Sequence, residues 1–304
     1  MLKLGIIGLA TKTNGHPFSY SSIINGYDSE KFPKDEWRGI YNYLERRHFS
    51  EMNIPNVKIT HLWTQDKHIS SSLAKACFIE KIVGDYENMI GEVDAVIIAR
   101  DDEENHYKMA KPFLDAGIYL FIDKPLTVDM NNLKYFSNYL KSGKLMSCSG
   151  IRYCSELDDF RAKNSWGKIN FITGTVMQDW EHYGIHLLEG IMGANAFKPL
   201  SVRAIRNNTL SVIITTDQEY NIVINTIGDS SFSFDLNYYC QDKNFSATIT
   251  DNFTAFKRML YSFIRLVQDG VEPYNARETI DLMKILIAAK LSIDNKEEII
   301  IDSD

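Results

Sequence analysis

The chain has 304 residues, of which 44% are apolar and 24% are charged. This is the composition of a globular protein with a substantial core, and it excludes a disordered or fibrous chain. The formal charge of −7 and the lack of a polybasic patch argue against nucleic acid or an anionic membrane as a partner, and no apolar run approaches the roughly 18–20 residues of a membrane span.

The first residues and the cysteines point to a reducing compartment. The apolar run at the start is only a few residues long and has no small-residue cleavage site, so it predicts a buried strand rather than a signal peptide. No two cysteines form a C-x-x-C pair, and no cysteine lies near a histidine at structural-zinc spacing. We therefore expect reduced thiols, no bound metal and a cytoplasmic location.

Residues 1–150 alternate short apolar runs with helix-like segments. The pattern predicts strands at 2–9, 57–64, 93–99, 118–122 and 145–149, with helices at 69–77, 104–116 and 131–140. Buried strands alternating with amphipathic helices indicate right-handed crossovers, so residues 1–150 are expected to form a doubly wound α/β domain. A charged, aromatic stretch at 27–55 delays the second strand and predicts a helical insertion, since Trp37, Ile40, Tyr41 and Leu44 recur at helical spacing.

Residues 151–304 have a different pattern. Closely spaced segments between 168 and 249 alternate β-branched or aromatic residues with polar ones, which indicates antiparallel strands joined by short turns. Helices are predicted at 253–267 and 278–291, followed by a short final strand. We expect an α+β domain with a mostly antiparallel open sheet that binds substrate, and whose open face makes the protein a homodimer or homotetramer.

The loop after the first strand is a degenerate dinucleotide fingerprint. In G-x-G-x-x-G, Gly8 supplies the first glycine, while Ala10 and Thr13 replace the other two. An ordinary strand-to-helix turn explains such a match equally well. Gly15, His16 and Pro17 are expected to extend the loop. The candidate pyrophosphate-binding residues are Gly8, Ala10, Thr11, Asn14 and Gly15.

The second strand ends at Thr64, followed by Gln65 and Asp66. A carboxylate at this point hydrogen-bonds the ribose 2′-hydroxyl of NAD, whereas an arginine favours the 2′-phosphate of NADP. Asp66, with Thr64 beside it, is the candidate ribose ligand and favours NAD over NADP. The alternative is that Asp66 caps the next helix.

Residues 93–126 carry the most specific pattern of the chain. A strand is followed by Ala99-Arg100-Asp101-Asp102, then by His106 at the start of a helix, and the next strand ends in Asp123-Lys124-Pro125. This arrangement resembles the signature region of the Gfo/Idh/MocA family of NAD(P)-dependent oxidoreductases. In that family, the strand that follows the histidine-initiated helix ends in Glu-Lys-Pro. Gly184-Ile185-His186-Leu187-Leu188 resembles the family's glycine–aliphatic–histidine segment.

The resemblance implies hydride transfer between a nicotinamide and a hydroxyl-bearing carbon of a sugar, sugar nucleotide or cyclitol. Lys124 and His186 are then the expected proton-handling residues, because alcohol oxidation needs a base at the hydroxyl oxygen. Pro125 is expected to follow a cis bond, as is common in the family. Expected cofactor contacts in this region are Arg100, Asp101, His106, Asp123 and Pro125, with His106 supporting the loop rather than reacting.

In the family, an aspartate usually stands four residues before the histidine that corresponds to His186. In this chain His182 occupies that position. His182 and His186 are expected on one helix face, with His182 holding substrate or relaying a proton. A zinc site at Glu181, His182 and His186 is an alternative, although the order is not that of H-E-x-x-H. The expected substrate contacts are Arg152, Tyr153, Trp180 and Tyr183, each of which could instead be core packing.

Two other hypotheses remain open from the sequence. The degenerate glycine loop and His182 in the aspartate position motivate a dinucleotide-binding regulator or scaffold that has lost catalysis. The third possibility is a lyase or epimerase that reduces and reoxidises bound NAD within one turnover.

Overall fold

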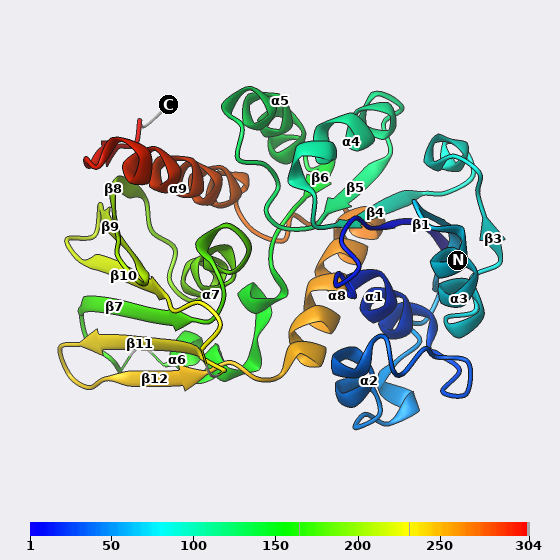
Figure 1. Ribbon diagram of the computed structural model, residues 1–304, viewed down its shortest axis with the longest axis horizontal. Coiled ribbons are helices and arrows are strands. Elements are labelled where there is room, and N and C mark those ends of the chain that lie inside the picture. The colour runs from blue at the N-terminus through cyan, green and yellow to red at the C-terminus, as the bar shows by residue number, and fades with distance from the viewer. Residues whose placement is uncertain (164, 231, 303–304) are drawn as a thin grey trace. The chain divides into compact units, whose positions relative to one another are not determined.

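The computed structural model describes residues 1–163, 165–230 and 232–302 (Figure 1). The chain divides into two compact units. Unit 1 comprises residues 1–127, 135–147 and 260–273, and unit 2 comprises 128–134, 148–259 and 274–304. Residues 260–273, which the sequence pattern assigns to the second domain, thus belong to the first unit.

Unit 1 contains a parallel six-stranded sheet in the order β3-β2-β1-β4-β5-β6, which is the doubly wound Rossmann order. Its two central strands, β1 and β4, are largely buried apolar runs, as predicted, and the predicted fold class is confirmed. The short β3 was not expected from the sequence. The strands are β1 (Leu2–Leu9), β2 (Val57–Thr64), β3 (Lys81–Ile82), β4 (Ala95–Arg100), β5 (Tyr119–Ile122) and β6 (Leu145–Met146).

The first helix, α1 (His16–Asn25), begins where the sequence predicted a longer loop, so that prediction is wrong. Pro17 lies in the first turn, where its missing N–H leaves no hydrogen bond unmade. Residues 17–24 are all buried, so α1 lacks the polar face that reveals a surface helix. The other helical segments of this half are α2 (Arg38–Leu44), η1 (Phe49–Glu51), α3 (Lys67–Ala76), η2 (Tyr86–Met89), η3 (Glu103–Asn105), α4 (His106–Asp115) and α5 (Met130–Lys141).

The predicted insertion between α1 and β2 contains α2 and η1, and it packs on the outer side of α1. The ring of Phe18 stacks on Trp37 at 5.1 Å between centroids and meets the edge of Phe32 at 5.6 Å. The backbone amides of Asn53 and Ile54 donate to the carbonyls of Ile23 and Ile24 in the last turn of α1. The insertion therefore covers the helix that the glycine loop leads into.

Unit 2 contains a seven-stranded sheet in the order β12-β11-β7-β10-β9-β8-β13. Only the β7–β10 pair is parallel among its described strands, so the predicted mostly antiparallel sheet is confirmed. Its strands are β7 (Ile169–Val176), β8 (Pro199–Arg206), β9 (Leu210–Thr216), β10 (Asn221–Thr226), β11 (Phe234–Cys240), β12 (Phe245–Thr248) and β13 (Ile299–Ile300).

One face of this second sheet is covered by helices. Alternate residues of β7 such as Ile172 and Val176 are buried, and Gly174 leaves room for the side chain of Leu187 in the helix above it. The opposite face carries half-exposed side chains such as Phe171 and Thr173. The helical segments of this half are η4 (Gly150–Tyr153), η5 (Ser155–Leu157), α6 (Asp158–Ala162), η6 (Trp180–Gly184), α7 (Ile185–Ala194), α8 (Asn252–Asp269) and α9 (Ala276–Asn295). The part of α8 from residue 260 onward belongs to unit 1.

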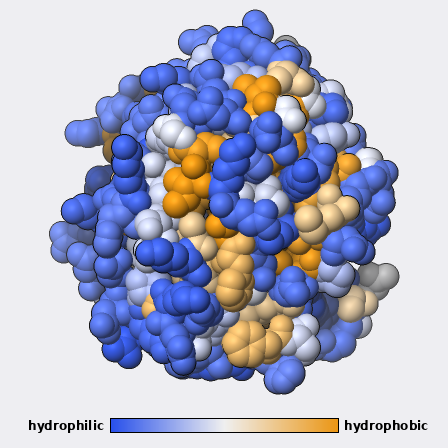
Figure 2. All heavy atoms as spheres, turned by 90° about the vertical axis from the view of Figure 1, so that its right-hand side faces the viewer, coloured by the Kyte–Doolittle hydropathy of each residue, from blue (hydrophilic) through white to orange (hydrophobic). Residues whose placement is uncertain are grey.

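In the described part of the chain, no helix is both long and apolar enough to cross a membrane. The face of the molecule that carries α3 and β3 is mainly hydrophilic, with apolar groups scattered among the polar ones (Figure 2). The four cysteines are buried thiols and form no disulfide.

Candidate functional site

The loop between β1 and α1 has the backbone shape of a ligand-binding turn. Leu9 and Ala10 adopt φ angles of 75° and 114°, a region that glycine favours. Gly8 cannot carry a side chain, because a Cβ there would lie 2.5 Å from the ring of Pro17. Ala10 thus adopts the conformation of the second fingerprint glycine, although it adds a methyl group.

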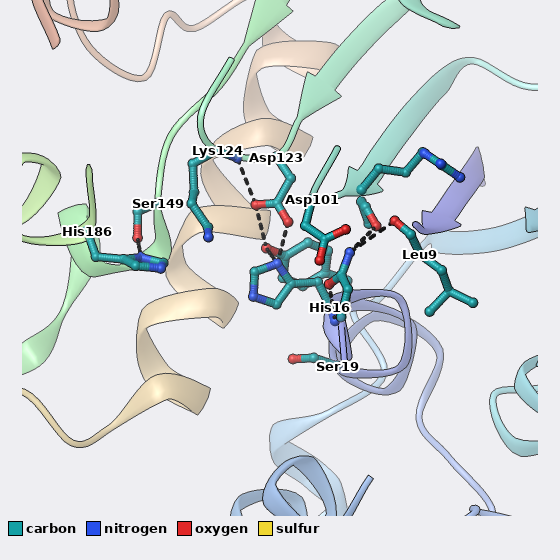
Figure 3. Close-up of polar contacts among 12 residues, drawn as sticks. Leu9, His16, Ser19, Asp101, Asp123, Lys124, Ser149 and His186 are labelled. Atoms are coloured by element: carbon teal, nitrogen blue, oxygen red, sulfur yellow. Dashed lines mark hydrogen bonds and ion pairs between the residues drawn. The ribbon is translucent and has the colours of Figure 1, made fainter. Parts of the chain in front are cut away.

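Asn14 holds this loop to the neighbouring strand rather than pointing to solvent. Its buried side-chain amide donates to the carbonyls of Leu9, at 3.3 Å, and Ala99, at 3.1 Å (Figure 3). Its side-chain oxygen accepts from the amide of His16 at 3.1 Å. Asn14 was predicted to contact a cofactor, and the structure instead gives it a role in shaping the loop and starting α1.

Asp101 lies just beyond the end of β4 and binds the same loop. One carboxylate oxygen accepts from the backbone N–H of Thr11 at 3.1 Å, and the other accepts from the Thr11 hydroxyl. Two donors of the glycine loop are therefore bound by a carboxylate of the protein itself.

At the end of β2, Asp66 caps the next helix. Its carboxylate accepts from the amides of His68, at 2.8 Å, and Ile69, at 3.2 Å, in the first turn of α3. Thr64 is buried, with its hydroxyl within 2.7 Å of the Ser70 hydroxyl. These contacts show that Asp66 caps α3 through one carboxylate oxygen, and the ribose contact stays a prediction.

Arg100 joins the ends of three strands. Its guanidinium forms a bidentate pair with Asp102 and also donates to the Gly8 carbonyl at 3.3 Å and to the Gln65 side chain at 2.9 Å. Gln65 in turn donates to the Ala10 carbonyl at 2.8 Å. Because Arg100 is buried, it positions the loops rather than presenting a charge to a ligand.

Lys124 directly follows β5, and its backbone amide donates to the Asp123 carboxylate at 2.9 Å (Figure 3). The Lys124–Pro125 peptide is cis, as expected. Asp123 is buried and pairs with the His16 imidazole from α1, and its second oxygen accepts from the Tyr20 hydroxyl at 3.4 Å. Burial alone would raise the pKa of Asp123, but His16, followed by Lys124, lowers it below the ordinary value of 3.8. Asp123 is thus a buried anion directly next to Lys124.

His106, at the first position of α4, is completely buried. Its Nδ1 lies 3.0 Å from the Leu126 carbonyl, and its Nε2 lies 3.2 Å from the Arg100 carbonyl. The ring therefore connects the loop after β4 to the segment that contains Lys124. It supports that segment, as expected, and has no surface left for a cofactor.

In unit 2, His186 lies in the first turn of α7 and is partly exposed. Its Nδ1 lies 2.6 Å from the Ser149 hydroxyl, which also accepts from the Ile151 amide at 3.2 Å (Figure 3). The Tyr183 ring packs edge-on against the imidazole at 5.5 Å. The contact with Ser149 fixes the orientation of the imidazole ring through its Nδ1.

His182 precedes α7 in the π-helical turn η6, so the two histidines do not share one regular α-helix as predicted. Its side chain is 61% exposed, and its Nδ1 lies 2.8 Å from the Asp179 carboxylate, which also caps the turn. An aspartate–histidine pair therefore exists here, although the carboxylate comes from Asp179. In the described residues, no group of three metal-ligating side chains could hold an ion.

Two of the predicted substrate contacts lie in the core of unit 2. Arg152 is buried between Glu189 and Glu278, at 2.5 Å from each carboxylate, so its charge is already compensated. Trp180 is buried and packs on Gly184, where a Cβ would lie 2.4 Å from the indole ring. For both, these contacts favour the packing alternative. Tyr153 and Tyr183 remain partly exposed.

Residues 39–149 match the model of the Gfo/Idh/MocA oxidoreductase family, which has an NAD-binding Rossmann fold. The matched segment lies in the first half of the chain. It contains the whole of the predicted signature region, so the resemblance is confirmed. The match begins after the glycine loop and α1, which is consistent with the degenerate fingerprint at Ala10 and Thr13.

Solved structures of inositol dehydrogenases resemble nearly the whole chain in fold, although their sequences are distant. A putative myo-inositol dehydrogenase from Sinorhizobium meliloti has a TM-score of 0.78 at 14% identity and covers 99% of this chain and 100% of its own. A myo-inositol 2-dehydrogenase from Lactobacillus plantarum has a TM-score of 0.78 at 16% identity, with 99% of each chain covered. A scyllo-inositol dehydrogenase from Lactobacillus casei, solved with NAD(H) and scyllo-inositol, has a TM-score of 0.77 at 12% identity and the same coverage. No curated protein matches the chain.

Three residues near the candidate site were not foreseen from the sequence. His16 and Tyr20 approach Asp123 from α1, and Ser149 approaches His186 from a segment 37 residues earlier. The spacing of His16 and Tyr20 could have placed them together, because residues four apart share a helix face. It was not used, because α1 itself was not predicted. No local pattern could have paired Ser149 with His186.

Proposed function

We propose that the protein is an NAD-dependent oxidoreductase that transfers a hydride between nicotinamide and a hydroxyl-bearing carbon of a cyclitol or related sugar. The observation that carries this proposal is the family match over 39–149. The matched range includes Asp123-Lys124-Pro125, which directly follow β5 of the parallel sheet. In such sheets, ligands bind beyond the carboxyl ends of the strands. The similarity in fold to inositol dehydrogenases supports a cyclitol as the substrate.

The residues after β1 fit a dinucleotide pyrophosphate. The left-handed backbone at Leu9 and Ala10 leads to α1, whose first turn has no acidic residue and whose N-cap residue, Gly15, has no side chain to cap it. The Asn14 side chain accepts from one amide of that turn, that of His16. Such a helix end favours an anion. The exception is Asp101, whose carboxylate is already bound to Thr11. The bound cofactor would supply the hydride chemistry, and NAD is favoured because the matched family is described as NAD-binding.

Lys124 and His186 are the proposed proton-handling residues. Lys124 is half-buried beside the Asp123 anion, which stabilises the protonated amine, and desolvation of the amine on ligand binding opposes this effect. The His186 imidazole is partly exposed and is oriented by the Ser149 hydroxyl at its Nδ1. We propose that Lys124 hydrogen-bonds the reacting hydroxyl and that His186 accepts or returns its proton.

A dinucleotide-binding regulator without catalysis is the second candidate. It is favoured by the carboxylate of Asp101 on the glycine loop and by the use of Asp66 as a helix cap. A lyase or epimerase that recycles NAD remains a further possibility, which net NADH formation would argue against. In either case the protein is expected to be a homodimer or homotetramer.

The decisive experiment combines cofactor binding with turnover. We expect NAD(H) at up to millimolar concentration to quench tryptophan fluorescence, and NADH to form with at least one of myo-inositol, scyllo-inositol or a related sugar. Lys124→Ala should lower kcat/KM by at least 100-fold and leave the Kd for NAD(H) within threefold, because the amine acts on the substrate hydroxyl.

Lys108→Ala is the matched control, because Lys108 is an exposed lysine of α4 in the same unit. It should leave both quantities unchanged. Absence of binding by both NAD(H) and NADP(H) would contradict the proposal. Binding without turnover on any polyol would favour the regulator.

A further inference from the structure

The glycine loop already holds an anion, and that anion belongs to the protein. Asp101 accepts from the backbone N–H and from the hydroxyl of Thr11, the residue that follows Ala10 in the second glycine position. Both carboxylate oxygens are engaged, one by each donor. No other residue of the loop from 9 to 14 is bound to a carboxylate by a described hydrogen bond.

The position of this carboxylate follows from the sheet. Gly8 and Leu9 at the end of β1 pair with Ala99 and Arg100 at the end of β4, so Asp101 is the first residue beyond the paired region. Arg100 beside it is fixed by Asp102, Gly8 and Gln65. The end of β4 therefore places the Asp101 side chain next to the loop that follows β1 (Figure 3).

The donors that Asp101 engages are of the kind that a pyrophosphate requires. In the dinucleotide fingerprint, the glycines let the loop backbone approach the pyrophosphate, whose oxygens accept from backbone amides at the start of the first helix. A carboxylate and a phosphate cannot both accept from the Thr11 amide, and two anions at that distance repel each other. Thr11 is exposed and Asp101 is half-exposed, so the carboxylate has solvent into which it can rotate.

We propose that Asp101 is an internal competitor of the dinucleotide pyrophosphate, and that cofactor affinity is set by how readily its carboxylate leaves Thr11. This inference rests on the proposed function, because it concerns the same cofactor. Only molecules in which the Asp101 carboxylate has left Thr11 can then bind the cofactor. The apparent affinity is therefore reduced in proportion to the fraction of such molecules. Hydrogen bonds to an ionised carboxylate are roughly twice as strong as neutral ones, so an amide at position 101 competes less well.

The test measures equilibrium binding of NAD⁺ and of adenosine, which has no phosphate, to the wild type, Asp101→Asn and Asp101→Ala. Calorimetry reports binding without any turnover. We expect both variants to bind NAD⁺ about tenfold more tightly than the wild type and to bind adenosine with an affinity within twofold of the wild type. Two variants are used because Asn keeps the shape of the side chain, whereas Ala removes the contact.

Glu104→Gln is the matched control, since it removes one exposed carboxylate three residues away. It should leave NAD⁺ affinity within twofold, and an equal gain in this variant would overturn the inference by showing a general charge effect. Unchanged or weaker NAD⁺ binding in both Asp101 variants, with clear binding by the wild type, would also overturn it and leave the proposed function intact. If no form of the protein binds a dinucleotide, the proposed function fails and the inference fails with it.

Discussion

At the scale of single residues, the clearest feature of the Lys124 segment is the buried Asp123 anion beneath it. His16 compensates this charge and Tyr20 adds a weaker contact, so the carboxylate is stable as an anion despite its burial. The Asp123 carboxylate is therefore expected to act as a fixed negative charge and not as a proton donor. It is expected to keep Lys124 charged until a ligand displaces water.

Asp123→Asn should lower the free energy of unfolding by about 2 kcal/mol at pH 7, because a charge-assisted hydrogen bond is lost. The folded-state pKa of Asp123 is below 3.8, so its contribution is fully present above pH 3.8 and is lost as the pH falls through the folded-state value. Urea unfolding between pH 2.5 and pH 7 should show the two proteins converging only at the acidic end.

The matched control for that measurement is Asp115→Asn, whose carboxylate forms an exposed pair with Lys111. An exposed pair contributes about 0–1 kcal/mol, so the variant should follow the wild type closely at every pH. A difference between Asp123→Asn and wild type that is constant from pH 2.5 to pH 7 would contradict the assignment of an ionised Asp123.

Ser149 is the positioning residue for the proposed role of His186. Ser149→Ala should lower kcat about tenfold with little change in KM, because the imidazole loses the partner that fixes its orientation. Ser149→Thr keeps the hydroxyl and should restore most of the rate. The pH profile of kcat should move in the alanine variant only. Equal rates in all three proteins would show that the hydrogen bond has no part in the reaction.

At the scale of elements, the insertion between α1 and β2 is fitted closely to the glycine loop. A Cβ on Gly15 would lie 2.5 Å from Cδ1 of Ile40 in α2 and 3.0 Å from the Trp37 ring, whereas Gly39 has nothing within 4 Å of such an atom. These two glycines form a natural pair for testing the contact.

Gly15→Ala should lower the free energy of unfolding by about 1–3 kcal/mol, as expected for overpacking. Gly39→Ala lies inside α2 and should raise it by about 0.5–1 kcal/mol, because alanine is the better helix former. Thermal and urea unfolding measure both. If the two variants have equal stability, α2 does not press on the loop as described.

Arg152 joins three helical segments of unit 2. It lies in η4, pairs with Glu189 of α7 and Glu278 of α9, and stacks on Tyr274 at 4.0 Å from the ring centroid. Burial raises the pKa of Glu189, and Arg152 opposes that rise. The charge pair is therefore a structural connection between the elements that surround His186.

Arg152→Leu should lower the free energy of unfolding by about 3–5 kcal/mol, because Glu189 is left buried without its partner. The double variant Arg152→Met with Glu189→Gln should recover most of that loss, since the carboxylate that then lacks its partner, Glu278, is partly exposed to solvent. Urea unfolding distinguishes the two. A fully stable Arg152→Leu protein with a raised KM would instead support the earlier hypothesis of a substrate contact.

At the scale of the whole molecule, the fold follows from patterns that the sequence displays. Continuous apolar runs such as Ala95–Ile98 predicted the buried parallel strands, and period-two alternation predicted the antiparallel sheet. The first helix escaped prediction because its sequence, HPFSYSSIIN, is buried on every side and has no polar face. The two residues of β3 are too few for any pattern.

The candidate site was less predictable than the fold. The family signature located Lys124 and His186, but sequence could not decide whether Asp66 caps a helix or holds a ribose, because one carboxylate suits both. Arg152 and Trp180 are residue types that both bind ligands and fill cores. Their burial depends on contacts from distant segments, which no local pattern reveals.

The open face of the second sheet predicts self-association. Phe171 and Tyr239 stack there at 5.9 Å, and Tyr239 is 42% exposed. Light scattering at micromolar concentration should show a dimer or tetramer, which Phe171→Lys combined with Tyr239→Lys should dissociate. Phe49→Lys, at an exposed position in unit 1, is the control and should leave the mass unchanged. A monomeric wild type would contradict this prediction.

The enclosure of α1 has a consequence for local opening. Amide protons of residues 20–24 can exchange with deuterated solvent only when the covering segment 27–55 detaches, because that segment bonds the last carbonyls of the helix and packs on its rings. The insertion and α1 should therefore exchange as one cooperative unit, and the neighbouring loop at 9–14 should exchange independently and faster.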